Sequence, residues 1–193
     1  AFLRIGASLI RFQAAHAGEA LLQDAERILD SIGVRSYGPL GSIAVDTVRR
    51  GDSLTAVGLV GFMAAAAVTE ELLFRGILFR VVEKWLGTWL ALVLTGLLFG
   101  LSHLFNPHAS LWGAIAIAIE AGGLLTAAYV ATRKLWVPIG VHFGWNFAAA
   151  GIFGTEVSGN GTPQGLLDAV TSGPSIITGG EFGPEGSLYS LLF

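Results

Sequence analysis

Three short patterns, each with two residues spaced four apart, carry the scarce polar side chains of strongly apolar sequence. They read Glu70-Glu71-x-x-x-Arg75, Phe99-x-x-x-His103 and His142-x-x-x-Asn146. A spacing of four puts both members of a pair on one face of a helix. A charged side chain at the centre of a membrane helix costs roughly 2.5 to 3.5 kcal/mol, so the first pattern would cost on the order of 8 to 10 kcal/mol if it were unpaired. These side chains must therefore face a protein interior or a wet cavity.

Such a cavity can support the hydrolysis of an amide bond. A carboxylate held in an apolar site is a competent base near neutral pH, and a histidine beside it can share the proton of a water molecule. A second histidine, with an asparagine one turn away, can donate hydrogen bonds to the oxyanion that develops during the attack. Two histidines and one carboxylate are also the ligand set of catalytic zinc sites. From the residues alone, both chemistries remain open.

Several other chemistries lack the residues that they need. The sequence has no cysteine, which excludes thiol catalysis and cysteine-based metal sites. It has neither a His-Glu-x-x-His helix nor a Gly-x-Ser-x-Gly elbow, and it has no aspartate inside its apolar runs. The net charge is -3, and no basic cluster is larger than Arg49-Arg50. We therefore expect no nucleic-acid partner.

The composition indicates a membrane protein. Hydrophobic residues make up 53% of the chain and charged residues only 13%, whereas about a quarter of the residues in a soluble domain are charged. Crossing a bilayer core of roughly 30 Å takes about 20 helical residues. Four apolar runs are of that order, at 54–84, 85–106, 109–132 and 135–154. The expected fold class is all-α, a polytopic membrane helical bundle with the active site in a cavity among the helices.

The chain divides into three parts. In the N-terminal segment, 1–53, helical spacing of apolar residues over 18–33 predicts an amphipathic helix, either at the membrane interface or packed on the rest of the molecule. A loop with one short apolar turn over 43–48 is expected to follow. Residues 54–154 form the catalytic core of membrane helices. Residues 155–193 are expected to be a Gly- and Pro-rich loop and the start of a further apolar helix, which points to a trimmed chain.

The positive charges predict an orientation in the membrane. Two short turns carry the basic residues Arg80, Lys84, Arg133 and Lys134. These turns would share one side of the membrane, which the positive-inside rule makes the cytoplasmic side. Arg49-Arg50 precede the first helix on the opposite side and argue against this orientation.

The three patterns, read with their neighbours, resemble one known family. The segments are Val68-Thr-Glu-Glu-Leu-Leu-Phe-Arg-Gly76, Phe99-Gly-Leu-Ser-His103 and Leu135-Trp-Val-Pro-Ile-Gly-Val-His-Phe-Gly-Trp-Asn146. Together they are similar to the CPBP family of intramembrane proteases, which includes type II CAAX prenyl endopeptidases and bacteriocin-processing or immunity proteins. The resemblance covers roughly 54–154. The tail around 172–184 resembles a bacterial branch of the family, which implies a multi-pass protein of the bacterial cytoplasmic membrane.

The resemblance implies roles for individual residues. Glu70 would be the base and would share the attacking water with His103, whereas His142 and Asn146 would stabilise the oxyanion. Glu71 and Arg75 would brace the site. The family also implies a metal-dependent alternative, in which one divalent metal such as zinc would be held by Glu70, His103 and His142; otherwise no cofactor is implied. The substrate would be a membrane-associated peptide or protein, CAAX-type prenylated or not, next to membrane lipid.

Less specific interpretations compete with this one. An i,i+4 ion pair between Glu71 and Arg75 explains both residues without chemistry, but Glu70 has no such partner on its own helix face. Glu120 is either a further polar group of the cavity or a helix-packing device. The chain could instead be a non-catalytic membrane immunity or scaffold protein of the same fold, or a small transporter that couples protons through its glutamates. The oligomeric state is not predicted.

The two histidines pose a geometric difficulty. At 1.5 Å per residue, His103 lies about 27 Å past Trp85, whereas His142 lies only about 10 Å past Leu135, at what should be the same side of the membrane. Straight helices would therefore place the two side chains at different depths. A shared site requires helices that are tilted, unequal or broken.

Overall fold

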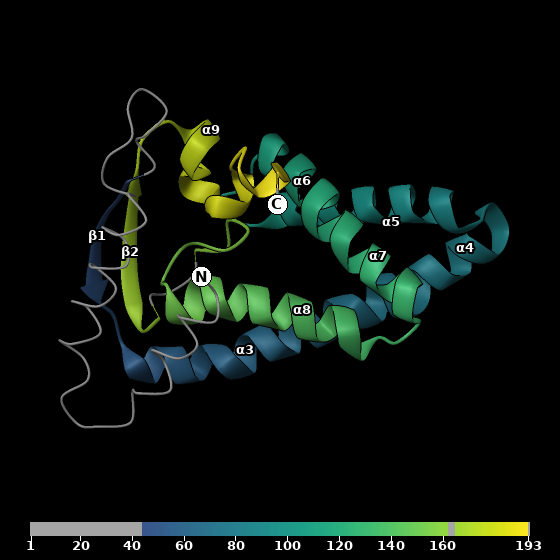
Figure 1. Ribbon diagram of the computed structural model, residues 1–193, viewed down its shortest axis with the longest axis horizontal. Helices are drawn as coiled ribbons and strands as arrows, with labels where there is room; N and C mark the ends of the chain where they lie inside the picture. The colour runs from purple at the N-terminus through teal and green to yellow at the C-terminus, as the bar shows by residue number, and fades with distance from the viewer. Residues whose placement is uncertain (1–43, 162–164, 193) are drawn as a thin grey trace.

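The computed structural model describes residues 44–161 and 165–192, and the chain over these ranges is largely helical (Figure 1). The amphipathic helix expected over 18–33 lies outside the described residues. Within these ranges, three helices are long and apolar enough to cross a membrane: Ser53–Leu86, Thr88–Phe105 and Leu111–Thr132. They coincide with the first three apolar runs of the sequence. The prediction of a helical bundle with several membrane-spanning helices is confirmed.

The first long helix is built from three segments. Helix α3 (Ser53–Glu71) continues through a π-helical segment, η1 (Leu72–Phe79), into α4 (Arg80–Leu86). Asp52 caps its N-terminus, where the carboxylate accepts hydrogen bonds from the backbone N–H groups of Leu54 and Thr55 at 3.1 and 3.0 Å. Gly87 ends α4 with a φ of 78°, a left-handed conformation that glycine adopts without strain.

Two further helices return across the molecule. Helix α5 (Thr88–Ser102) ends in a 3₁₀ turn, η2 (His103–Phe105). Helix α6 (Leu111–Ile117), capped by the Ser110 hydroxyl, continues through the π-helical segment η3 (Ala118–Gly122) into α7 (Gly123–Thr132). Small residues let these helices approach closely. A Cβ atom added at Gly100 would collide with the Ala114 carbonyl oxygen and with Ala118.

The fourth apolar run forms helix α8 (Trp136–Asn146), which continues into the π-helical segment η4 (Phe147–Ile152). Figure 1 shows α8 beside α3, and α7 running obliquely between the levels of α5 and α8. Leu59 and Met63 of α3 form a buried cluster with Ala150 and Val157. A second cluster at the opposite end joins Phe79, Ala91 and Tyr129. The core is therefore distributed along the helices, and many large apolar side chains remain on the outer surface.

The basic turns lie at one end of the molecule, as predicted. The Arg133 guanidinium donates two hydrogen bonds to the Glu83 carboxylate, at 2.6 and 2.8 Å, and so joins the end of α7 to α4. Which side of the membrane this end faces stays a prediction.

A two-stranded antiparallel ribbon was not predicted. Strand β1 (Ala44–Arg50) pairs with β2 (Leu167–Ser172), with Ala44 opposite Ser172 and Arg50 opposite Leu167. The expected apolar turn over 43–48 is therefore wrong: the segment is a strand whose partner lies more than 100 residues away.

The expected loop after residue 154 also contains regular structure. Besides β2 it holds α9 (Ser175–Thr178) and the 3₁₀ turns η5 (Gly180–Phe182), η6 (Pro184–Gly186) and η7 (Ser190–Leu192). These short elements lie against the ends of α5 and α6 (Figure 1). The segment is thus a packed part of the molecule, which positions residues near the candidate site.

Candidate functional site

The predicted ion pair between Glu71 and Arg75 is present and fully buried. Arg75 Nη1 lies 2.8 Å from Glu71 Oε1, and the two residues are 1% and 0% exposed. The rest of the guanidinium donates to the Thr126 hydroxyl at 3.2 Å and to the carbonyl oxygens of Ala121 and Gly122 at 3.1 and 3.3 Å. Arg75 therefore ties the first long helix to the segment that joins η3 to α7.

His142 joins this pair from helix α8. Its Nδ1 lies 2.9 Å from Glu71 Oε1, so the same carboxylate oxygen contacts both Arg75 and His142. A carboxylate only accepts hydrogen bonds, so His142 Nδ1 carries the hydrogen. This contact fixes the direction of the ring and leaves Nε2 available on the other side.

Glu70 approaches that available nitrogen. Its Oε2 lies 3.9 Å from His142 Nε2. The side chain is 35% exposed, yet Oε2 itself is buried and has no hydrogen-bond partner among the described residues. A buried carboxylate oxygen without a partner is costly in a structural role. Glu70 and Glu71 thus face opposite nitrogens of one imidazole ring. Oε1 of Glu71 is hydrogen bonded to Arg75 and His142, whereas Oε2 of each glutamate is buried without a partner among the described residues.

His103 reaches the same region from the end of α5. Its Nδ1 lies 2.8 Å from the Phe99 carbonyl oxygen, one turn earlier in the helix, so this nitrogen donates. In the neutral ring Nε2 is then an acceptor. The Phe99 ring lies near both histidine rings, with centroids 5.0 Å from His103 and 6.0 Å from His142. The structure therefore brings both histidines around one aromatic side chain.

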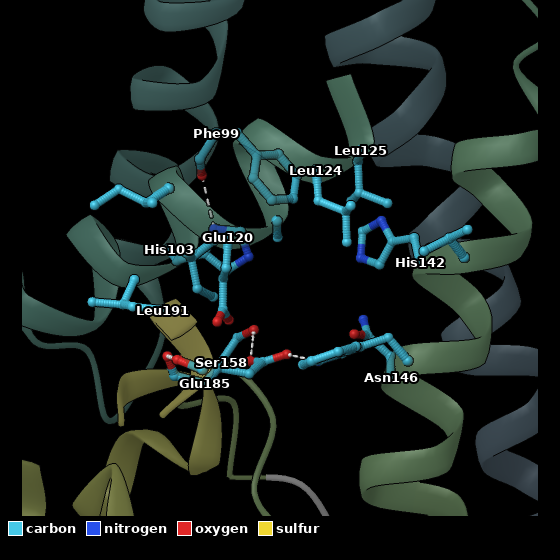
Figure 2. A pocket seen from close by; sticks show the side chains of 16 residues that line it. Phe99, His103, Glu120, Leu124, Leu125, His142, Asn146, Ser158, Glu185 and Leu191 are labelled. Carbon is cyan, nitrogen blue, oxygen red and sulfur yellow. Dashed lines mark hydrogen bonds between the residues drawn. The ribbon is translucent and has the colours of Figure 1, made fainter. Parts of the chain in front are cut away.

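A cavity of about 230 Å³ lies between the two histidines. Figure 2 shows His103 and Glu120 on one side of it, His142 and Asn146 on the other, and Ser158 with Glu185 below. Most of the remaining lining is apolar and comes from α6, η3, α7 and α8. Glu70 is not among the lining residues and lies next to His142 instead. Three of the four expected catalytic residues thus face one cavity, and the fourth lies beside it.

Two further carboxylates line the cavity. Glu120 does so, in agreement with the first of the two interpretations that the sequence left open, and its Oε2 is buried without a hydrogen-bond partner in the part of the chain that the structure describes. Glu185, the second, was not singled out from the sequence. Glu185 is buried and hydrogen bonded. Nothing in its Gly- and Pro-rich surroundings marked it as a core residue.

The residues expected to hold a divalent metal are not arranged as a metal site. Over the described ranges, no group of three His, Asp or Glu side chains has a geometry that could hold a metal ion. The Nδ1 atoms of His103 and His142 are hydrogen bonded to the Phe99 carbonyl and to Glu71, which leaves Nε2 as the possible ligand atom of each ring. Glu70 Oε2 and His142 Nε2 lie 3.9 Å apart, but His103 does not join them in a geometry that could hold a metal ion.

Comparison with known proteins agrees with the motifs. The family model "Type II CAAX prenyl endopeptidase Rce1-like" matches residues 52–148, about half of the chain. The matched range contains all six expected site residues and the helices that carry them. Comparisons with curated proteins and with solved structures gave no match. An intramembrane protease family and three helices of spanning length make this an integral membrane protein, and the chain belongs to the Rce1-like family of type II CAAX prenyl endopeptidases.

Proposed function

We propose that the protein is an intramembrane endopeptidase, which hydrolyses peptide bonds of membrane-associated proteins or peptides with a water molecule activated by Glu70 and His103. The family is a protease family, and a protease of this kind acts on a protein or peptide. One observation carries the proposal. The buried, unpartnered Glu70 Oε2 lies 3.9 Å from His142 Nε2, beside a cavity that His103, His142 and Asn146 line.

Glu70 and His103 have the properties of the two groups that take a proton from water. The Glu70 carboxylate has an oxygen with unused acceptor capacity. His103 donates through Nδ1 to the Phe99 carbonyl, which leaves Nε2 as an acceptor in the neutral ring. In the proposed step a water O–H bond breaks, its proton moves to Glu70, and the hydroxide oxygen bonds to the carbonyl carbon of the peptide.

His142 and Asn146 would stabilise the negative oxygen that results. They lie one helical turn apart on the same wall of the cavity. Because His142 Nδ1 already donates to Glu71, the ring can donate through Nε2 only as the imidazolium. The Glu71 carboxylate would orient this ring, as the aspartate orients the histidine in serine protease triads. The proton held by Glu70 would then pass to the leaving amine as the C–N bond breaks.

The mostly apolar cavity suits this chemistry and sets the class of substrate. Hydrogen bonds to a developing oxyanion are stronger where water is excluded. The aliphatic lining, which includes Ile117, Leu124 and Val141, favours an apolar side chain next to the cleaved bond. We place the protein in the bacterial cytoplasmic membrane, on the resemblance of its tail. A prenylated CAAX peptide and its lipid-free analogue, tested side by side, decide whether the lipid is required.

The experiment is cleavage of a membrane-anchored reporter peptide by the purified protein in liposomes, followed by mass spectrometry. Glu70→Ala, His103→Ala and His142→Ala are each expected to lower kcat by at least about a hundredfold, since single general-base or oxyanion groups contribute on this scale. Glu181→Gln is the matched control, because the Glu181 side chain is 90% exposed and its carboxylate lies 3.9 Å from the exposed His108. Wild-type activity in Glu70→Ala and His142→Ala would refute the assignment.

A non-catalytic immunity or scaffold role is the second candidate. It is favoured by the contacts among Glu71, Arg75 and His142, which join three helices within the bundle and need no substrate to explain them. This role predicts that partner binding or protection survives Glu70→Ala, because Glu70 contributes little to those contacts.

A further inference from the structure

The C-terminal segment, residues 182–191, completes the cavity although it lies outside the family-matched range. Phe182 is buried in a cluster with Phe74, Phe99 and Ile117, so it packs next to the ring that lies between the two histidines. The Trp112 indole N–H donates to the Gly186 carbonyl oxygen at 2.9 Å. These contacts fix the segment on the helices that carry the site.

Glu185 is the polar centre of this segment. It is 6% exposed, and each of its carboxylate oxygens accepts one hydrogen bond. The Trp145 indole Nε1 donates to Oε1 at 2.8 Å, and the Ser158 hydroxyl donates to Oε2 at 2.6 Å. Both bonds appear in Figure 2, where Glu185 and Ser158 lie on the cavity side facing Asn146. A charged acceptor makes these bonds roughly twice as strong as bonds between neutral groups.

Trp145 connects Glu185 to the candidate catalytic helix. It stands in α8 directly before Asn146 and three residues after His142, and all three residues line the cavity. The Trp145 side chain is 49% exposed, so packing alone holds it weakly. Directly after Asn146 the α-helix gives way to the π-helical segment η4, where the regular hydrogen-bond ladder changes. Besides the apolar packing of Phe143 and Phe147, the contact with Glu185 is therefore a polar anchor of α8 at the point where its geometry changes.

We propose that Glu185 is a positioning residue, which holds the end of α8 through Trp145 so that the Asn146 amide faces the cavity. The consequence for catalysis rests on the proposed endopeptidase function; the consequence for the position of Asn146 does not. Glu185→Met has nearly the same length and volume but no oxygen that accepts from either donor. It therefore removes both bonds without opening a large cavity, whereas Glu185→Gln would keep both, because the Ser158 hydroxyl can accept from the glutamine NH₂.

The position of Asn146 can be observed directly. The chain has only three asparagines, Asn106, Asn146 and Asn160. NMR of ¹⁵N-asparagine-labelled protein in detergent micelles therefore gives three side-chain amide signals, and the signal that disappears in Asn146→Ala is that of Asn146. Glu185→Met is expected to shift the Asn146 signal and to leave Asn160 unchanged, because the Asn160 amide donates to the Val157 carbonyl outside the cavity. Glu181→Met, the matched exposed control, should move none of them. An unmoved Asn146 signal in Glu185→Met would overturn the proposal.

Kinetics tests the catalytic consequence. Glu185→Met is expected to lower kcat by about tenfold or more, the scale of a lost charged hydrogen bond, with KM nearly unchanged. Ser158→Ala, which removes only one of the two donors, should move kcat and the Asn146 signal in the same direction by less. A changed KM with wild-type kcat would make Glu185 part of a cover over the cavity and would refute the positioning role. If the wild-type protein cleaves no peptide, the endopeptidase proposal fails, while the amide signals still decide the role of Glu185.

Discussion

Removing the Arg75 guanidinium should lower the free energy of unfolding far more than removing the guanidinium of an exposed arginine. Arg75 is 1% exposed, and it is the cation beside the fully buried Glu71. Arg75→Met keeps most of the side-chain volume but leaves the Glu71 charge uncompensated. It also removes the donor that the carbonyl oxygens of Ala121 and Gly122 share. Breaking a buried pair in this way costs about 3 to 5 kcal/mol of the free energy of unfolding. The protein should therefore lose a large fraction of its stability.

The control is Arg133→Met, which breaks the ion pair with Glu83. Arg133 is 51% exposed, and ion pairs at such sites contribute about 0.2 to 1 kcal/mol. Both variants are measured by reversible unfolding in mixed micelles at increasing denaturing detergent. The double variant Glu71→Gln/Arg75→Met should recover about half of the loss, since the uncompensated charge is gone. Equal losses for Arg75→Met and Arg133→Met would refute the reasoning.

Two further predictions concern the ends and the packing of the helices. The pKa of Asp52 is lowered, first by the hydrogen bond from the Thr55 hydroxyl and next by those from the backbone amides of Thr55 and Leu54. The stabilising effect of the Asp52 carboxylate is therefore present above the ordinary pKa of 3.8 and is lost as the pH falls through the lowered pKa. The melting temperature of the wild type should therefore fall more on acidification than that of Asp52→Asn. Parallel curves of melting temperature against pH would contradict this. Gly100→Ala should cost about 1 to 3 kcal/mol of unfolding free energy, because the added methyl group collides with α6. Gly58 has open space around it, so Gly58→Ala should change the unfolding free energy by less than about 1 kcal/mol. Equal effects of the two variants in the same unfolding assay would show that the close approach of α5 and α6 is not required.

Local rules of helix geometry account for what could be predicted from the sequence. The i,i+4 spacing placed Glu71 and Arg75 together, and the structure has them 2.8 Å apart. The cost of charge in lipid indicated that both must be enclosed, and they are. The lengths of the apolar runs located three helices to within a few residues. Each of these inferences depends on neighbours within one helix or on the thickness of a bilayer.

Contacts between distant segments could not be predicted in the same way. Strand β1 pairs with β2, which lies more than 100 residues away, so its short β-branched pattern was indistinguishable from a turn. Glu185 follows Gly183-Pro184 in a segment with every local sign of a loop, and its burial depends on Trp145 and Ser158, which come from other parts of the chain. The imidazole of His142 likewise finds Glu71 across 71 positions.

The difference in depth calculated for the two histidines disappears because the helices are neither straight nor parallel. Each helix that carries a site residue changes its hydrogen-bond pattern close to that residue. Segment η1 begins directly after Glu71, α5 turns into a 3₁₀ helix at His103, and η4 begins directly after Asn146. Such changes alter the rise and the rotation per residue, and π-helical segments occur often at functional sites. A calculation with a constant 1.5 Å rise therefore fails at the residues whose depth matters most, and the enclosed polar groups themselves are the better guide to where the helices converge.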